Sequence, residues 1–255
     1  MSSLFGEMSP TWNVSKDRLK RMNVDIVFVI DATESMQPLI DTVKNLTLKF
    51  HEVLTEACKE AKKPIQNLRT KVIVFRDYYI DDKDAMLESK FFLLPEETGA
   101  FYDFIGNIHE GGGGDEPESG LEALALAIRP RDFVAEGEKR RHVIVLFSDA
   151  SAHPLEQQLD GVPSNYPPHM PKNLQELQQA WGDVEYPLAA ERIRAIGGVM
   201  DPITKRLVLF TPDVKPWTDI SSFSEVTLIP IDRGNGGSDV NAESILDAII
   251  HSVEV

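Results

Sequence analysis

The sequence predicts an α/β fold: a doubly wound (Rossmann-like), mainly parallel six-stranded sheet with one antiparallel edge strand and helices on both faces. Three observations support this prediction. Short runs rich in β-branched residues alternate with longer segments of helical periodicity, the pattern of a sheet covered on both sides. Two runs, 24–30 and 142–147, are almost entirely apolar and indicate strands buried on both faces. The 255 residues, 42% of them hydrophobic, suffice for a large core.

The first half of the chain alternates between strands and helices. The strand at 24–30, interrupted only by Asp25, ends at Asp31. Apolar residues at helical spacing then predict one long amphipathic helix from Met36 to about residue 60, with Pro38 in its first turn. The other elements expected in this half are a strand at 69–76, a short antiparallel edge strand at 90–94, and helices at 96–108 and 121–128.

The second half contains an irregular segment between two buried strands. Residues 154–205 follow the strand at 142–147, are rich in proline, and are too long for an ordinary connection. The elements expected here are helices at 173–181 and 188–196, a strand at 206–210, a short helix at 217–223, an edge strand at 225–231, a loop at 234–237 and a closing helix at 241–253. We interpret residues 1–22 as an N-terminal extension, and 23–255 as a single domain with an insertion at about 154–205.

Charge and cysteine content exclude several classes of function. Lysine and arginine number 26 against 41 aspartates and glutamates, a net charge of −15 that repels nucleic acid and anionic membranes and favours cations and basic partners. The single cysteine, Cys58, can form neither an internal disulfide nor a cysteine zinc site. The sequence has no secretory signal pattern and no apolar run approaching 18 residues, so we expect a cytoplasmic location.

Oxygen-bearing side chains follow the first strand at alternate positions. Asp31, Thr33 and Ser35 come where that strand ends, and ligands of open α/β sheets bind beyond the carboxyl ends of strands. Carboxylate and hydroxyl oxygens suit Mg²⁺, Mn²⁺ or Ca²⁺ rather than Zn²⁺. The same residue types are common in turns and helix N-caps, which is the structural alternative.

Two further acidic loops strengthen the prediction of a cation site. Residues 111–114 are four consecutive glycines, followed by Asp115, Glu116 and Glu118. This loop lacks a Gly-Lys-Ser/Thr motif and follows no strand, and its carboxylates would repel phosphate, so the alternative of a phosphate-binding loop is disfavoured. Asp149 follows the strand at 142–147, which the pattern places near the centre of the sheet.

Three motifs in this order resemble those of a von Willebrand factor A (vWA) domain. They are Asp31-Ala32-Thr33-Glu34-Ser35, the glycine loop with Asp115, and Ser148-Asp149-Ala150. Gly112 to Glu118 is similar to the G-G-G-D-x-P-E variant of hemicentin-type and α-kinase-associated vWA domains, and Phe75-Arg76-Asp77-Tyr78 is similar to the Y-R-D motif of the latter. The resemblance covers roughly residues 22 to 253.

The resemblance implies a metal-ion-dependent adhesion site (MIDAS). Position by position, Asp31, Thr33 and Ser35 are the first-loop ligands and Asp149 is the third-loop ligand. The usual second-loop threonine has no counterpart, and Asp115 is the best candidate for its place. In the family, hydroxyl groups usually bind the metal directly and aspartates largely through water. Glu34 is a second departure, because glycine is common at that position.

The function implied is a metal-dependent protein-binding scaffold without catalysis of its own. A divalent cation, Mg²⁺ or else Mn²⁺ or Ca²⁺, keeps an open coordination position that an acidic residue of a partner fills. Relatives in bacterial stress and conflict systems imply kinase, phosphatase or ATPase components as partners.

Other interpretations stay open. A metal-dependent hydrolase such as a phosphatase is one, with His109 and His153 as bases, but the second aspartate of a D-x-D nucleophile loop and a G-x-S-x-G elbow are both absent. A degenerate metal site in a structural or interaction domain is another. For His153 we favour a loop or capping role over ligation. The 154–205 insertion either determines partner specificity or covers a sheet edge.

Overall fold

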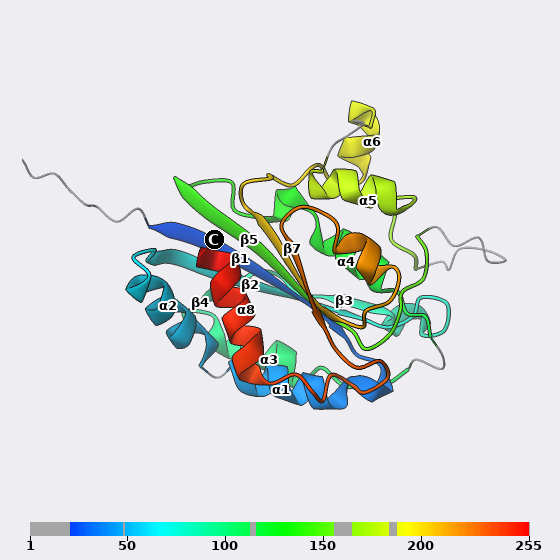
Figure 1. Cartoon of the computed structure of the whole chain (residues 1–255), viewed down its shortest axis with the longest axis horizontal. Helices are drawn as coiled ribbons and strands as arrows, with labels where there is room; N and C mark the ends of the chain where they lie inside the picture. The colour runs from blue at the N-terminus through cyan, green and yellow to red at the C-terminus, as the bar shows by residue number, and fades with distance from the viewer. Residues whose placement is uncertain (1–20, 48, 113–115, 156–164, 184–187, 255) are drawn as a thin grey trace, which may run out of the picture.

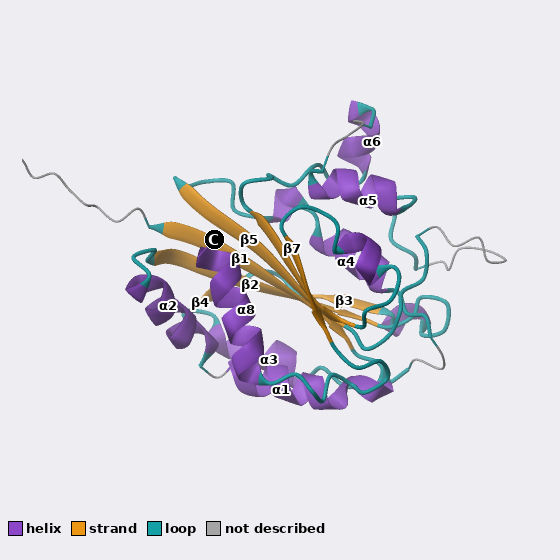
Figure 2. Cartoon of the chain, in the orientation of Figure 1, coloured by secondary structure: helices purple, strands orange, loops and turns teal. Residues whose placement is uncertain are grey.

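A single mixed sheet runs through the molecule between two layers of helices (Figure 2). The computed structural model describes residues 21–47, 49–112, 116–155, 165–183 and 188–254. The strands are β1 (Met22–Asp31), β2 (Ile65–Phe75), β3 (Met86–Glu88), β4 (Phe92–Leu94), β5 (Lys139–Phe147), β6 (Lys205–Thr211) and β7 (Val226–Pro230). Their order across the sheet is β3-β2-β1-β5-β6-β7, and β4 also pairs with β2.

The pairing confirms the predicted fold class. Neighbouring strands from β2 through β1, β5 and β6 to β7 are parallel. The antiparallel edge consists of two short strands, since β3 and β4 each pair with a different part of β2. The sheet therefore has seven strands rather than the six predicted: the expected edge strand at 90–94 corresponds to β4, and β3, separated from it by the irregular residues 89–91, was not expected.

Helices cover both faces of the sheet (Figure 1). They are α1 (Gln37–Thr47), α2 (Phe50–Glu60), α3 (Thr98–Gly106), α4 (Gly120–Ala127), α5 (Leu174–Trp181), α6 (Ala190–Ala195), α7 (Trp217–Ile220) and α8 (Ala242–Glu254), with 3-10 turns at Glu34–Met36, Asp82–Asp84 and Pro130–Asp132. Buried residues of α1, α2, α3 and α8 pack on one face, and those of α4, α5 and α7 on the other.

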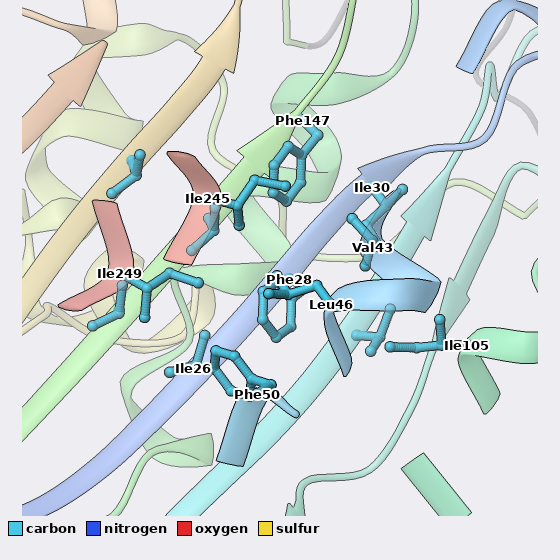
Figure 3. Packing of buried hydrophobic residues seen from close by; sticks show 14 of the residues in the cluster. Ile26, Phe28, Ile30, Val43, Leu46, Phe50, Ile105, Phe147, Ile245 and Ile249 are labelled. Carbon is cyan, nitrogen blue, oxygen red and sulfur yellow. The ribbon is translucent and has the colours of Figure 1, made fainter. Parts of the chain in front are cut away.

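The central strand β1 contributes to both layers because its side chains alternate between the faces. Ile26, Phe28 and Ile30 point into the first layer (Figure 3), where the ring of Phe28 lies 5.6 Å from that of Phe50. Val27 and Val29 belong to the cluster on the opposite face. Burial on both sides explains why the run is almost entirely apolar.

The expected single helix from Met36 to about residue 60 is wrong. The structure has two helices, α1 and α2, and Lys49 before α2 is outside the helical region with φ −126° and ψ 1°. Apolar side chains on both helices face the same layer, so helical spacing continues across the break. Periodicity therefore could not locate it.

The one charged residue within the β1 run has a structural explanation. Asp25 is 1% exposed and accepts two hydrogen bonds of 2.7 Å from the guanidinium of Arg69 on β2. Its carboxylate also accepts from the backbone N–H of Val134 at 2.6 Å. This ion pair lies near the amino end of β1, away from the loops that follow Asp31.

Candidate metal centre

The carboxyl ends of β1 and β5 bring two of the predicted aspartates together. The strands are adjacent and parallel, so Asp31 at the end of β1 and Asp149 just beyond β5 lie at the same end of the sheet. Ser148 links the two loops, because its hydroxyl donates to Oδ2 of Asp31 at 2.7 Å. The prediction that Asp149 follows a central strand is confirmed.

Two hydroxyl groups join this pair of carboxylates. The Thr33 hydroxyl donates to Oδ1 of Asp31 at 2.7 Å, and its backbone N–H donates to the same oxygen at 2.9 Å. The Ser35 hydroxyl donates to Oδ1 of Asp149 at 3.1 Å. Four of the five predicted site residues therefore form one cluster, while Asp115 lies outside the described residues.

The electrostatics of this cluster favour a cation. Asp31 is fully buried, and burial raises its pKa to about 6 although hydrogen bonds from Thr33 and Ser148 oppose the shift. The negative charge of Asp149 raises that pKa further. Among the described residues, no basic side chain forms an ion pair with either aspartate. Ser35 is exposed, as is Glu34 beside it, so the cluster is open to solvent there.

The loop between β7 and α8 completes the site, which the sequence did not suggest. It runs alongside the start of α1 (Figure 1) and donates from the backbone N–H of Gly236 to Oδ2 of Asp149 at 2.7 Å. The carbonyl of Gly236 accepts from the N–H of Leu39. Gly236 has φ 62°, and a methyl group on it would overlap the carbonyl oxygen of Ser35. Glycine is therefore required at this position.

Arg76 connects the first loop, the turn at Asp82–Asp84 and the start of the glycine loop. Its guanidinium donates to the carbonyls of Ala32 (3.2 Å), Asp84 (2.7 Å), His109 (2.6 Å) and Gly111 (2.6 Å). In the sequence, Arg76 stood out only as part of Phe75-Arg76-Asp77-Tyr78, which is similar to a vWA-family motif. The bonds show that its role is structural: it positions backbone rather than facing a ligand.

An ion pair connects the glycine loop to the β7–α8 loop. Glu116 pairs with Arg233, which holds the pKa of that carboxyl below its usual range, and it also accepts from the Ser151 hydroxyl at 3.3 Å. The next acidic residue, Glu118, is buried and pairs its backbone with Ala152. These contacts hold together the loops around the cluster of Asp31, Thr33, Ser35 and Asp149, which we call the Asp31 cluster.

His153 belongs to a second buried polar cluster rather than to the first. Its Nε2 lies 3.3 Å from Oδ2 of Asp77, whose Oδ1 accepts from the Ser119 hydroxyl at 3.3 Å. Nearby, burial raises the pKa of Glu122 to about 7, although the Tyr166 hydroxyl donates to it at 2.9 Å. The described residues contain no group of three or more His, Cys, Asp or Glu side chains placed to hold a metal. The Asp31 cluster differs in combining two carboxylates with hydroxyls.

Comparisons with known proteins agree with this architecture. A family model described as von Willebrand factor A domain matches residues 25–160. The alpha-protein kinase vwkA of Dictyostelium discoideum is 26% identical over 137 residues, 52% of this chain and 19% of that protein. The chain thus matches only a small part of this relative.

The solved structures show the same fold. Two crystal structures of the pilus adhesin SpaC from Lactobacillus rhamnosus GG, one in an open conformation, match with a TM-score of 0.51 at 13% identity, over 92% of this chain and 31% of theirs. None of the helices in the described ranges is long and apolar enough to cross a membrane. From the family match over more than half of the chain, the protein belongs to the von Willebrand factor A domain family.

Proposed function

We propose that the Asp31 cluster is a MIDAS that binds a divalent cation, Mg²⁺ or else Mn²⁺ or Ca²⁺. The observation that carries the proposal is the pairing of each hydroxyl with a carboxylate. Thr33 and Ser35 direct their protons to Asp31 and Asp149, which leaves the lone pairs of both hydroxyl oxygens for a cation. Hard oxygen donors of this kind suit these ions.

We further propose that the bound ion captures a carboxylate of a protein partner. The ion supplies a Lewis acid with an open position, and exposed Ser35 gives a partner access to it. Protein binding is a common role of vWA domains, and the SpaC structures are of a pilus adhesin. As the partner we propose a kinase, phosphatase or ATPase component of a cytoplasmic system such as a bacterial stress or conflict operon. The match to an alpha-protein kinase supports only the kinase among these.

In this proposal the protein is a scaffold, not an enzyme. The His153–Asp77–Ser119 cluster has its carboxylate in the middle, so the histidine does not contact the serine hydroxyl as a base would. If purified protein hydrolysed p-nitrophenyl phosphate and Asp31→Ala abolished that activity, the hydrolase alternative would replace the scaffold.

Thermal unfolding tests the metal site, because a ligand that binds only the native state raises Tm with its concentration. Wild type, Asp31→Ala and the control Glu136→Ala, which replaces an exposed carboxylate before the amino end of β5 and so at the opposite end of the sheet, are compared with EDTA, Mg²⁺, Mn²⁺ and Ca²⁺. We expect the ions to raise Tm of the wild type and the control but not of Asp31→Ala. An equal response of all three proteins, or none, would favour the degenerate-site alternative.

A further inference from the structure

A cavity separate from the Asp31 cluster lies beside the proline-rich segment that follows the Asp149 loop. It has a volume of about 550 Å³, within the range of small-molecule pockets. Its walls come from the end of α4, the 129–132 turn, the β2–β3 edge and residues 165–169 and 195–197 of the predicted insertion. No residue of the Asp31 cluster lines it. We call it the Arg129 pocket.

Arg129 brings a positive charge into this pocket. Within the described part of the chain, its guanidinium has no hydrogen-bond or ion-pair partner. The backbone of Gly197 packs close to the stem of this side chain, because a methyl group on Gly197 would lie only 3.3 Å from its Cγ. Gly197 has φ 109°, so glycine allows this turn to pack closely against the arginine.

The other charged groups around the pocket already have partners. Glu88 and Asp132 both pair with Lys71, which is 7% exposed, at 2.9 and 3.4 Å. Arg131 donates to the carbonyl of Arg194 at 2.9 Å, which ties the insertion to the 129–132 turn. The single Lys71 offsets one of these two carboxylates, and Arg131 and Arg129 have no carboxylate partner among the described residues, so these three cations and two carboxylates leave one net positive charge. Of the two arginines, Arg129 is the one without a hydrogen-bond partner in the described part of the chain.

The remaining walls are largely apolar. They are formed by Tyr78, Met86, Leu126, Pro167, Pro168 and Ala195. The ring of Tyr78 is held by the ring of Tyr166, with centroids 5.4 Å apart. An arginine fork with an apolar and aromatic wall recognises a planar or tetrahedral oxyanion attached to a hydrophobic body.

We propose that the Arg129 pocket binds a small organic anion, with one phosphate or carboxylate group that pairs with Arg129 and an apolar body that lies against Tyr78 and Leu126. The site is separate from the metal centre and does not depend on the function proposed for it. The insertion then serves to build a ligand pocket against the edge of the sheet.

Isothermal titration calorimetry tests this proposal with phenyl phosphate, benzoate and inorganic phosphate, each at matched ionic strength. Ligands of about ten heavy atoms are expected to bind in the millimolar range. Phenyl phosphate or benzoate should bind more tightly than inorganic phosphate, and the tighter of the two identifies the anionic group. Arg129→Ala should weaken that binding at least about tenfold, because a charged hydrogen bond is lost.

Two variants serve as controls. Arg194→Ala removes an exposed arginine on the same segment that does not line the pocket, and Asp31→Ala disables the metal centre; both should bind the anion as the wild type does. If Arg129→Ala does not fold, Arg129→Gln keeps the stem and removes the charge. Wild type that binds none of the probes, or an Arg129 variant that binds them equally well, would overturn the proposal.

Discussion

The backbone N–H of Gly236 donates to the carboxylate of Asp149 over 2.7 Å, although 87 residues separate them. The loop before the last helix is therefore part of the Asp31 cluster. Because φ at Gly236 is 62° and its neighbour is the Ser35 carbonyl, this contact depends on a residue without a side chain.

Gly236→Ala should destabilise the protein by about 2–4 kcal/mol, since it adds both backbone strain and overlap with Ser35. Urea unfolding measures this loss. Gly234→Ala is the matched control: φ there is 65°, but the added methyl meets nothing within 4 Å, so only the conformational cost of about 1 kcal/mol remains. Equal losses for the two variants would show that close packing against Ser35 is unimportant.

The raised pKa of Asp31 predicts how stability depends on pH without metal. Its pKa rises from 3.8 to about 6 on folding, so the native state holds the proton more tightly and stability falls as the pH rises from about 4 to 6. The resulting penalty above pH 6 is on the order of 2–3 kcal/mol.

Asp31→Asn removes this titration while keeping the shape of the side chain. In EDTA, the stability of the variant relative to the wild type should increase as the pH rises from 4 to 6, because only the wild type must ionise a buried carboxyl group. Above pH 6 the difference should stay constant. Chemical unfolding at several pH values measures the difference. Comparing the two proteins cancels the effect of Glu122, which also titrates near neutrality. A difference independent of pH would contradict the assigned pKa.

Arg76→Lys should loosen the loops around the site. A lysine keeps the charge but lacks the planar guanidinium that reaches four carbonyls at once. We therefore expect the free energy of unfolding to fall by about 2–3 kcal/mol. Hydrogen exchange should increase at Gly111, whose N–H donates to the Ala32 carbonyl. Lys83→Ala, which replaces a nearby exposed residue, should leave both the stability and the hydrogen exchange of Gly111 at their wild-type values.

The buried ion pair of Asp25 and Arg69 should matter more than any surface pair. Asp25→Ala leaves the Val134 N–H without its acceptor and the guanidinium with only the Asp132 carbonyl, and should cost about 3–5 kcal/mol. By contrast, Glu56→Ala breaks an exposed pair with Lys59 and should change stability by less than about 1 kcal/mol. Urea midpoints that shift equally for the two variants would refute this ranking.

Sequence patterns predicted the features that depend on residues close together in the chain. The apolar runs located β1 and β5, and the residues just after them supplied Asp31, Thr33, Ser35 and Asp149. The sequence places Arg76 in a family-like motif and Gly236 in a loop, but it carries no signal for the contacts across the fold on which their roles depend. The division between α1 and α2 was missed for a different reason: both helices bury residues at a continuous helical spacing.

Direct titration of Mn²⁺, followed by electron paramagnetic resonance at neutral pH, tests the central claim most simply. Wild type should bind one ion per chain, Mg²⁺ should compete for it, and Asp149→Ala and Ser35→Ala should each weaken binding while Glu136→Ala, at the opposite end of the sheet, does not. Wild type that leaves all the manganese free, or an Asp149→Ala variant that binds it as tightly as the wild type, would contradict the assignment of the Asp31 cluster as a metal centre.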